Sequence, residues 1–145
     1  MRGLRVATGV LAVIGIGIAG YLTYVHYAGI NPICVAGGGG CEKVQTSKWA
    51  ELAGVPVAVL GLAGYVAILA SLALPEDTGQ MVAALLSFIG LAFSAYLTYR
   101  ELFTIHAVCQ WCVASAVIMA LLAAVSVARL LRVEEPGAVP APARR

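Results

Sequence analysis

Charge is scarce in this chain of 145 residues. Only 11% of the residues are Asp, Glu, Lys or Arg, whereas 61% are hydrophobic. A water-soluble domain of this size could not cover so much apolar surface with so few charges. The nine basic residues form no stripe interleaved with aromatics, which argues against nucleic acid as a partner. The composition therefore places the chain in a lipid bilayer.

Charged residues are absent altogether from four apolar blocks. Each block has 19 or more residues, enough for a helix to cross about 30 Å of hydrocarbon. The sequence therefore predicts an all-α fold, an integral membrane four-helix bundle that occupies residues 1–132. Residues 133–145, rich in Pro, Ala and charge, are predicted to form a disordered cytoplasmic tail. An extracytoplasmic loop at 31–51 joins the first two of the predicted helices, which lie at about 6–30, 52–74, 81–101 and 107–131.

A cleavage site is lacking after the first apolar block. Arg2 and Arg5 precede this block, so a removable signal peptide is an alternative to a first membrane helix. The apolar part of a signal peptide spans only about 7–15 residues and ends at a small-x-small site, and the block fits neither feature. We therefore expect the first block to stay in the protein as a helix.

Basic residues are few at one predicted face of the membrane and gather at the other. An even number of crossings puts six of the nine on the side of both termini: Arg2, Arg5, Arg129, Arg132, Arg144 and Arg145. The positive-inside rule makes that side the cytoplasm. The turn at 75–79 is acidic and lies on the same side, but acidic residues count little in this rule. We expect a multi-pass protein with both termini in the cytoplasm.

The extracytoplasmic loop contains a run of glycines, Gly37–Gly40, and reads as a flexible segment. After this run, Ser47 is placed to cap a short helix over 48–53. Gly54 follows at a position typical of a helix end. The loop is therefore predicted to contain a half-helix that lies at the membrane surface.

Cysteine is also scarce, and all four cysteines fall on the same predicted extracytoplasmic face. That side of a membrane is oxidising enough for disulfides. The residues form two local pairs, Cys34 with Cys41 and Cys109 with Cys112. Four cysteines allow three connectivities, and a redox relay uses more than one of them in turn.

The segment Cys109-Gln110-Trp111-Cys112 has the C-x-x-C spacing of a redox pair. It lies at the start of the fourth predicted helix, where the two sulfurs are one turn apart on a single face. The positive end of a helix stabilises a thiolate, which is the attacking species in disulfide exchange. Half a zinc site or a structural bridge would have the same spacing. The position at the edge of the hydrocarbon favours a pair that meets a lipid-soluble oxidant.

The loop cysteines, Cys34 and Cys41, enclose a segment rich in glycine. A static bridge is one alternative, although a run of four glycines makes a poor rigid staple. Such a tether suits a Cys41 that moves between Cys34 and the C-x-x-C pair. A zinc site made by all four cysteines is disfavoured, because the six-residue interval exceeds the usual spacing of roughly two to four. We therefore expect no metal.

Other polar residues near the cysteines give weaker signals. His106, three residues before the C-x-x-C pair, is placed to support a thiolate or to give a proton to a reduced acceptor, and a packing role is equally open. Arg100 and Glu101 are interpreted as a solvated pair at the interface, with tuning of the cysteines as the alternative. The string Tyr-Leu-Thr-Tyr occurs at 21–24 and 96–99, either as membrane-interface anchors or as the frame of a site.

Together these features resemble the vitamin K epoxide reductase family, and specifically its bacterial members. The resemblance covers about residues 21–115. It rests on the two cysteine pairs, on Ser47 six residues after Cys41, and on the runs KWAELAGVPVAVLG at 48–61 and YRELFTIHAVCQWC at 99–112. Two cysteine pairs and the serine in this order, on this hydropathy pattern, form a specific signal.

The resemblance implies a four-helix bundle around a quinone, either menaquinone or ubiquinone. It implies that Cys34 exchanges with a partner protein and that Cys41 passes electrons to Cys109. Cys112 then faces the quinone and can form an adduct with it. Ser47 belongs to the cap near the active site.

The resemblance also implies a partner. Bacterial members reoxidise a thioredoxin-fold thiol oxidase that inserts disulfides into secreted proteins, and many carry this partner as a fused C-terminal domain. This chain ends in a short tail, so we expect a stand-alone form whose extracytoplasmic partner acts in trans. The expected protein is a quinone-dependent thiol/disulfide oxidoreductase of the bacterial cytoplasmic membrane that supports disulfide bond formation.

Two alternatives to this function stay open. The same relay would serve a reductase that recycles a quinone or vitamin K epoxide. Animal members place a tyrosine shortly after the C-x-x-C pair where this chain has Ala116, so epoxide reduction does not transfer from them directly. A non-enzymatic membrane scaffold with two structural disulfides is the second alternative.

Overall fold

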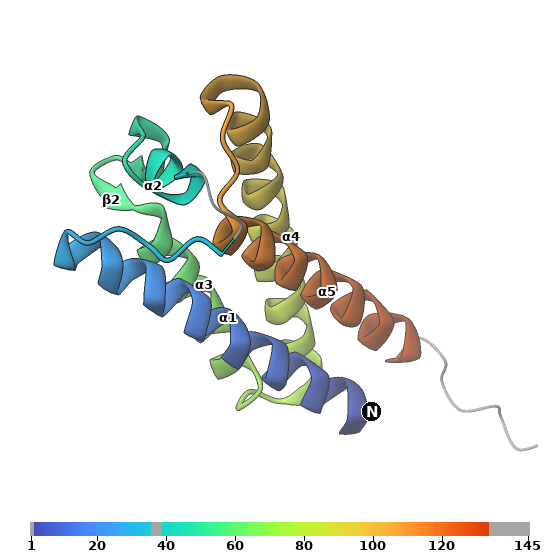
Figure 1. The fold of residues 1–145 in the computed structure, drawn as a ribbon. Helices are drawn as coiled ribbons and strands as arrows, with labels where there is room; N and C mark the ends of the chain where they lie inside the picture. Colours follow the sequence, from blue (N-terminus) through green and yellow to red (C-terminus); the bar gives the residue numbers. More distant parts are fainter. Residues whose placement is uncertain (1, 36–38, 134–145) are drawn as a thin grey trace, which may run out of the picture.

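The computed structural model of the protein describes residues 2–35 and 39–133, shown as coloured ribbon in Figure 1. Four helices form the bundle: α1 (Arg2–Ala28), α3 (Val57–Ser71), α4 (Glu76–Arg100) and α5 (Gln110–Val133). Helices α1 and α4 each pack against both α3 and α5. The predicted all-α four-helix bundle is confirmed. Gly37 and Gly38 of the predicted tether lie outside the described residues, as does the predicted tail from 134 onward.

Helix α1 ends two residues earlier than the predicted first helix. Gly29 follows it with a φ of 64°, a left-handed conformation that glycine adopts without strain. The Gly29 N–H donates to the His26 carbonyl and the Ile30 N–H donates to the Val25 carbonyl. These two bonds satisfy carbonyls at the helix end in the pattern of a Schellman motif, so the sequence Ala-Gly-Ile stops the helix here.

The second apolar block forms a shorter helix than the predicted span of 52–74. Helix α3 has 15 residues, which corresponds to about 22 Å of helix. Among the described residues, three helical stretches are long and apolar enough to cross a membrane, namely α1, α4 with its continuation to Ile105, and α5. Helix α3 completes the bundle between α1 and α4.

The residues before α3 form a hairpin, so the predicted half-helix over 48–53 is wrong. Only a single 3-10 turn, η1 (Lys48–Ala50), is helical there. Strand β1 (Glu51–Leu52) then pairs antiparallel with β2 (Val55–Pro56). The two turn residues, Ala53 and Gly54, have φ values of 53° and 81°, which is the conformation of a tight two-residue hairpin turn. Gly54 therefore makes a hairpin where the sequence suggested a helix end.

The short helix of the loop lies earlier in the chain than predicted. Helix α2 (Gly40–Gln45) precedes Ser47 and packs against η1. The Ser47 hydroxyl donates to the Val44 carbonyl at 2.7 Å and makes no capping bond to η1. Ser47 therefore closes the end of α2, and α2, η1 and the hairpin together form a cap over one end of the bundle, visible in Figure 1.

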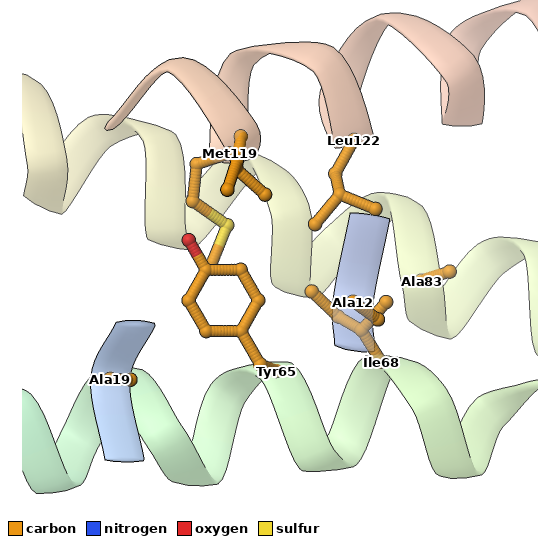
Figure 2. Packing of buried hydrophobic residues seen from close by; sticks show 8 residues of the cluster. Ala12, Ala19, Tyr65, Ile68, Ala83, Met119 and Leu122 are labelled. Atoms are coloured by element: carbon orange, nitrogen blue, oxygen red, sulfur yellow. The ribbon is translucent and has the colours of Figure 1, made fainter. Parts of the chain in front are cut away.

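The bundle core contains small residues of α1 packed against larger side chains of the other helices. Figure 2 shows the Tyr65 side chain reaching from α3 toward Met119 of α5. Gly15 makes room for this ring, because a Cβ atom at that position would overlap it. The buried residues of this core are Ala12, Ala19, Tyr65, Ile68, Ala83, Ile118, Met119 and Leu122.

The end of the bundle opposite the cap carries a cluster of ion pairs between side chains. The Glu76 carboxylate at the start of α4 lies 3.5 Å from the guanidinium of Arg5 in α1. It also lies 3.5 Å from the guanidinium of Arg129 near the end of α5. The start of α1 and the end of α5 therefore meet at one end of the bundle, as an even number of crossings requires.

Candidate active site

All four cysteines lie together at the cap end of the bundle. Cys34 is bonded to Cys41, whereas Cys109 and Cys112 are free thiols. Cys41 and Cys109 belong to one buried cluster, with 1% and 0% of their surface exposed, and the other two cysteines pack at its edge. The fold thus brings the two predicted pairs together, with one cysteine of each pair on the inside.

Gly40 is the residue that allows α2 to approach the C-x-x-C pair. A Cβ atom at Gly40 would lie 2.6 Å from the carbonyl oxygen of Val108, closer than side-chain atoms are found to approach. Val108 immediately precedes Cys109, and Cys41 immediately follows Gly40. The absence of a side chain at Gly40 therefore lets the first turn of α2 place Cys41 beside Cys109.

The segment around the first loop cysteine is held by the two residues between the C-x-x-C sulfurs. The Trp111 indole donates to the Ile33 carbonyl at 2.8 Å, and the Gln110 side-chain oxygen accepts the Val35 N–H at 3.1 Å. The Tyr21 hydroxyl of α1 accepts the Ile33 N–H at 3.0 Å, and its ring lies 5.0 Å from that of Trp111. In Figure 1 the chain after α1 runs back to the start of α5. The C-x-x-C segment therefore also fixes the position of the loop disulfide.

Cys109 sits where the start of α5 stabilises a thiolate. Its carbonyl accepts the Val113 N–H at 3.0 Å, so Cys109 occupies the N-cap position. The hydrogen bond from the Cys112 thiol lowers the pKa of Cys109 to about 7, although burial opposes this. The Cys112 N–H and the Gln45 amide also lower the pKa of Cys109, while the negative charge of Glu101 raises it. Cys109 is therefore the thiol of this pair that ionises near neutral pH.

Gln45 contacts both sulfurs of the C-x-x-C pair from the cap. Its side-chain nitrogen lies 3.9 Å from Cys109 Sγ and 3.6 Å from Cys112 Sγ. A neutral amide donor stabilises negative charge on either sulfur without itself carrying a proton to exchange. No local sequence signal points to this role, because the pattern does not predict the helix that carries Gln45.

A cavity of about 340 Å³ lies between the bundle helices and the cap. This volume is in the range of small-molecule binding pockets. Its walls are mainly apolar, with Leu22, Phe93 and Met119 among the lining side chains. Cys112 lines the cavity and Cys109 does not, so the two sulfurs face different neighbours. The polar side chains of the wall include Gln45, Ser47, Tyr65, Arg100, Glu101 and Ser115.

The predicted solvated pair of Arg100 and Glu101 is wrong. Glu101 has 3% of its surface exposed and accepts the Cys109 N–H at 3.1 Å. The Arg100 guanidinium instead stacks 4.1 Å from the Trp49 ring and 5.1 Å from the Tyr96 ring. A π-helical turn, η2 (Glu101–Ile105), begins directly after Arg100. This wider turn changes which face of the helix each residue occupies, and a regular helical reading of the sequence could not anticipate it.

The structure places the two predicted supporting residues differently. Ser47 is half-buried and lines the cavity. His106 is exposed, ends η2 with a φ of 55° and does not line the cavity. Tyr65 was missed, although it is the only aromatic residue of the second apolar block, and its hydroxyl donates to the Ser115 carbonyl at 2.9 Å. Within residues 2–35 and 39–133, no group of three or more metal-ligating side chains occurs.

Comparison with known protein families identifies the family of the chain. The sequence model of the vitamin K epoxide reductase family matches residues 6–127. This range contains all four cysteines, the cap and the residues that line the cavity. The resemblance noted from the sequence therefore extends over nearly the whole described chain.

Proposed function

The chain belongs to the vitamin K epoxide reductase family of thiol and quinone oxidoreductases, and from this premise we propose that it carries electrons from an extracytoplasmic protein dithiol to a quinone. Electrons enter at the loop pair and leave from the C-x-x-C pair. The observation that carries this proposal is the division between the two C-x-x-C thiols. Cys109 is buried in one cluster with Cys41, whereas Cys112 lines the cavity.

The cavity has features that suit a quinone. Its walls are mainly apolar, and Cys112 provides a redox-active sulfur at the wall. Leu60 of α3 and Ile89 of α4 line it and have 39% and 58% of their surface exposed. An opening between these helices would admit a molecule from the bilayer. A bound menaquinone or ubiquinone would supply a two-electron acceptor at this position.

The first step of the proposed relay occurs at Cys34. This residue is half-buried between the exposed side chains of Ile33 and Val35, so a partner thiolate can reach its sulfur. Attack forms a bond between the partner sulfur and Cys34 Sγ, and Cys41 leaves as a thiolate. The second thiol of the partner then attacks this mixed disulfide, which oxidises the partner and releases Cys34 as a thiol.

The second step passes the electron pair between the two pairs of cysteines. When Cys109 and Cys112 are oxidised, the Cys41 thiolate attacks Cys109 Sγ and Cys112 leaves as a thiolate. Cys34 then attacks Cys41, which restores the loop disulfide and frees Cys109. The products are the arrangement seen in the structure, with a disulfide at Cys34–Cys41 and two thiols at the C-x-x-C pair.

We also propose the orientation and the setting. Both termini lie in the cytoplasm and the cysteines face the extracytoplasmic side of a bacterial cytoplasmic membrane. The meeting of Arg5 and Arg129 at the end opposite the cap supports this orientation. Residues 1–132 act as one domain, and a thioredoxin-fold thiol oxidase is its electron donor.

Quinone reduction by the purified protein in detergent tests this function. Cys109→Ala or Cys112→Ala should abolish turnover with any donor, because a single thiol of this pair cannot form the disulfide that releases two electrons, and Cys34 and Cys41 do not line the cavity. Cys34→Ala or Cys41→Ala should block a reduced thioredoxin-fold donor and partly spare a small dithiol that reaches the C-x-x-C pair directly. The measurement is the rate of quinone loss with each donor.

The two donors also separate the alternatives. If both fail equally in the Cys34→Ala and Cys41→Ala variants, the loop pair is structural. If neither donor is affected by these changes, the relay through the loop pair is wrong. A protein scaffold would turn over with neither donor in the wild type.

A further inference from the structure

Glu101 is the only carboxylate among the described residues whose side chain is buried. None of the ion pairs in the described part of the chain involves it. Burial of a carboxylate without a cationic partner is unfavourable and is retained mostly where it has a use. The position of Glu101 beside the redox pair suggests what that use is.

The neighbours of Glu101 are the two thiols and the cavity. One carboxylate oxygen accepts the Cys109 N–H at 3.1 Å. The Cys112 thiol is also placed to donate to the Glu101 carboxylate, as the alternative to donating to Cys109. Both Glu101 and Cys112 line the cavity. A single carboxylate therefore lies beside the redox pair and beside the space that would hold the electron acceptor.

We propose that Glu101 is the acid–base residue that carries a proton from the Cys112 thiol to the quinone. This inference rests on the proposed function, since it needs a quinone in the cavity. The other polar residues of the wall fit the role less well. Gln45 and Ser47 do not titrate in the neutral range, and the Tyr65 hydroxyl already donates to the Ser115 carbonyl. His106 does not line the cavity.

The proton and electron balance of the step is as follows. Oxidation of Cys109 thiolate and Cys112 thiol forms one S–S bond and breaks one S–H bond. Two electrons pass from the sulfurs to the quinone, and the Cys112 proton passes to Glu101 and from there to a quinone oxygen. The quinol needs a second proton, which comes from water. This proton balances the one that Cys109 released to water when its thiolate formed. Glu101 ends the step as a carboxylate, ready for the next turnover.

Glu101→Gln is the sharpest test. The amide oxygen can still accept the Cys109 N–H, so the local structure should survive, but the side chain can no longer carry a proton. We expect kcat for quinone reduction to fall by about 100-fold, the usual size of a general acid–base contribution. Glu101→Asp should recover part of the loss. Glu42→Gln, which alters an exposed carboxylate on α2, is the control and should leave kcat unchanged.

A second readout does not depend on the quinone. In a Cys34→Ala, Cys41→Ala background, absorbance near 240 nm follows thiolate formation at the reduced C-x-x-C pair. The groups that face this pair are Gln45 from the cap and Glu101 from η2, and only Glu101 is charged. Removing its negative charge with Glu101→Gln should shift the thiolate titration to lower pH. The variant should therefore hold more thiolate at neutral pH and yet reduce quinone more slowly.

This pairing of results separates the outcomes. A purely structural or electrostatic role predicts that more thiolate gives an equal or higher rate, so unchanged or faster quinone reduction by Glu101→Gln would overturn the inference. Glu101→Gln could also lose both the thiolate titration and quinone reduction, with no recovery of either in Glu101→Asp. That result would overturn the inference in favour of a structural role. If the wild type transfers electrons to no quinone, the proposed function fails and this inference fails with it.

Discussion

Cys109 shows how one residue takes its chemistry from its place in the chain. It lies at the N-cap of α5, where the sulfur occupies the position that a serine or aspartate oxygen takes in other helices. The hydrogen bond from Cys112 adds to this stabilisation and holds the pKa of Cys109 near 7. The same residue is fully buried beside Cys41. Cys109 is therefore suited both to ionise and to receive electrons from the loop.

The ionisation of Cys109 gives a prediction with a definite sign. Because the pKa of Cys109 is lowered to about 7, its thiolate should form as the pH rises through 7 and should be lost as the pH falls below it. Gln45→Leu removes an amide donor from the sulfur and should shift the titration to higher pH. The measurement is thiolate absorbance of the reduced C-x-x-C pair, with Cys34 and Cys41 replaced by alanine.

A neighbour of Gln45 provides the matched control for this titration. Thr46 is exposed, and its hydroxyl donates to the Glu42 carbonyl of its own helix. Thr46→Val should therefore leave the midpoint where it is in the wild type. An equal shift in both variants, or no shift with Gln45→Leu, would show that the amide does not stabilise the Cys109 thiolate.

Sequence alone could identify the cysteines but not the residues that tune them. The C-x-x-C spacing and its position at a helix start are enough to predict a redox pair. Gln45 and Glu101 act because the cap folds over the bundle and because a π turn redirects the end of α4. Neither event has a local sequence signal. The burial of Glu101 in particular contradicts the usual behaviour of a Glu next to an Arg at a membrane surface.

Among the elements, α2 does the most to connect the two pairs of cysteines. It begins at Gly40 against the Val108 backbone, carries Cys41 in its first turn and presents Gln45 at its end. Gln110 and Trp111 hold the other side of the loop. The cap thus brings both loop cysteines to the start of α5 through two separate sets of contacts.

Gly40→Ala tests the contribution of this close approach. The new Cβ would lie 2.6 Å from a backbone oxygen that cannot move aside as a side chain can, so α2 must shift. A displacement of this kind should slow transfer from Cys41 to Cys109 by roughly 10- to 100-fold. Turnover with a small dithiol, which bypasses the loop, should change little. The measurement is the rate of quinone reduction with the protein donor and with the small dithiol.

The adjacent glycine serves as the control for Gly40. A Cβ at Gly39 would meet nothing within 4 Å, although the residue has a φ of 67°. Asparagine tolerates this left-handed conformation better than most residues, so Gly39→Asn should leave the protein-donor rate close to that of the wild type. Equal rates for Gly40→Ala and the wild type would show that the contact with Val108 does not position Cys41.

The cap was the part of the fold that sequence described least well. A polar loop between apolar blocks predicts that a cap exists, but Ser47 and Gly54 wrongly predict its helix at 48–53. In the structure Ser47 closes α2, and Gly54 forms the hairpin turn. Both residues fit either role in a local reading, and packing against the bundle selects between them. By contrast, the end of α1 at Gly29 depends on a local motif and fell within two residues of the prediction.

At the scale of the whole molecule, charge is concentrated at the two ends of an apolar bundle. The acidic turn before α4 is unusual for the cytoplasmic side that the positive-inside rule assigns to it. In the structure Glu76 lies between Arg5 and Arg129, so the acidic residue joins three helix ends instead of opposing the basic ones. The bundle itself follows from hydropathy, because each long apolar block has to be helical in a bilayer. The thiols and the cavity lie at the other end, where a partner and a membrane acceptor would both have access.

The most direct test of this account asks which two sulfurs meet. In a Cys34→Ala, Cys112→Ala variant only Cys41 and Cys109 remain, and both lie in the same buried cluster. Mild oxidation should link them within one chain, detected by mass spectrometry of the joined peptides. The matched Cys34→Ala, Cys109→Ala variant retains Cys41 and Cys112 and should link poorly, because Cys112 faces the cavity. Efficient linkage through Cys112, or none through Cys109, would contradict the relay.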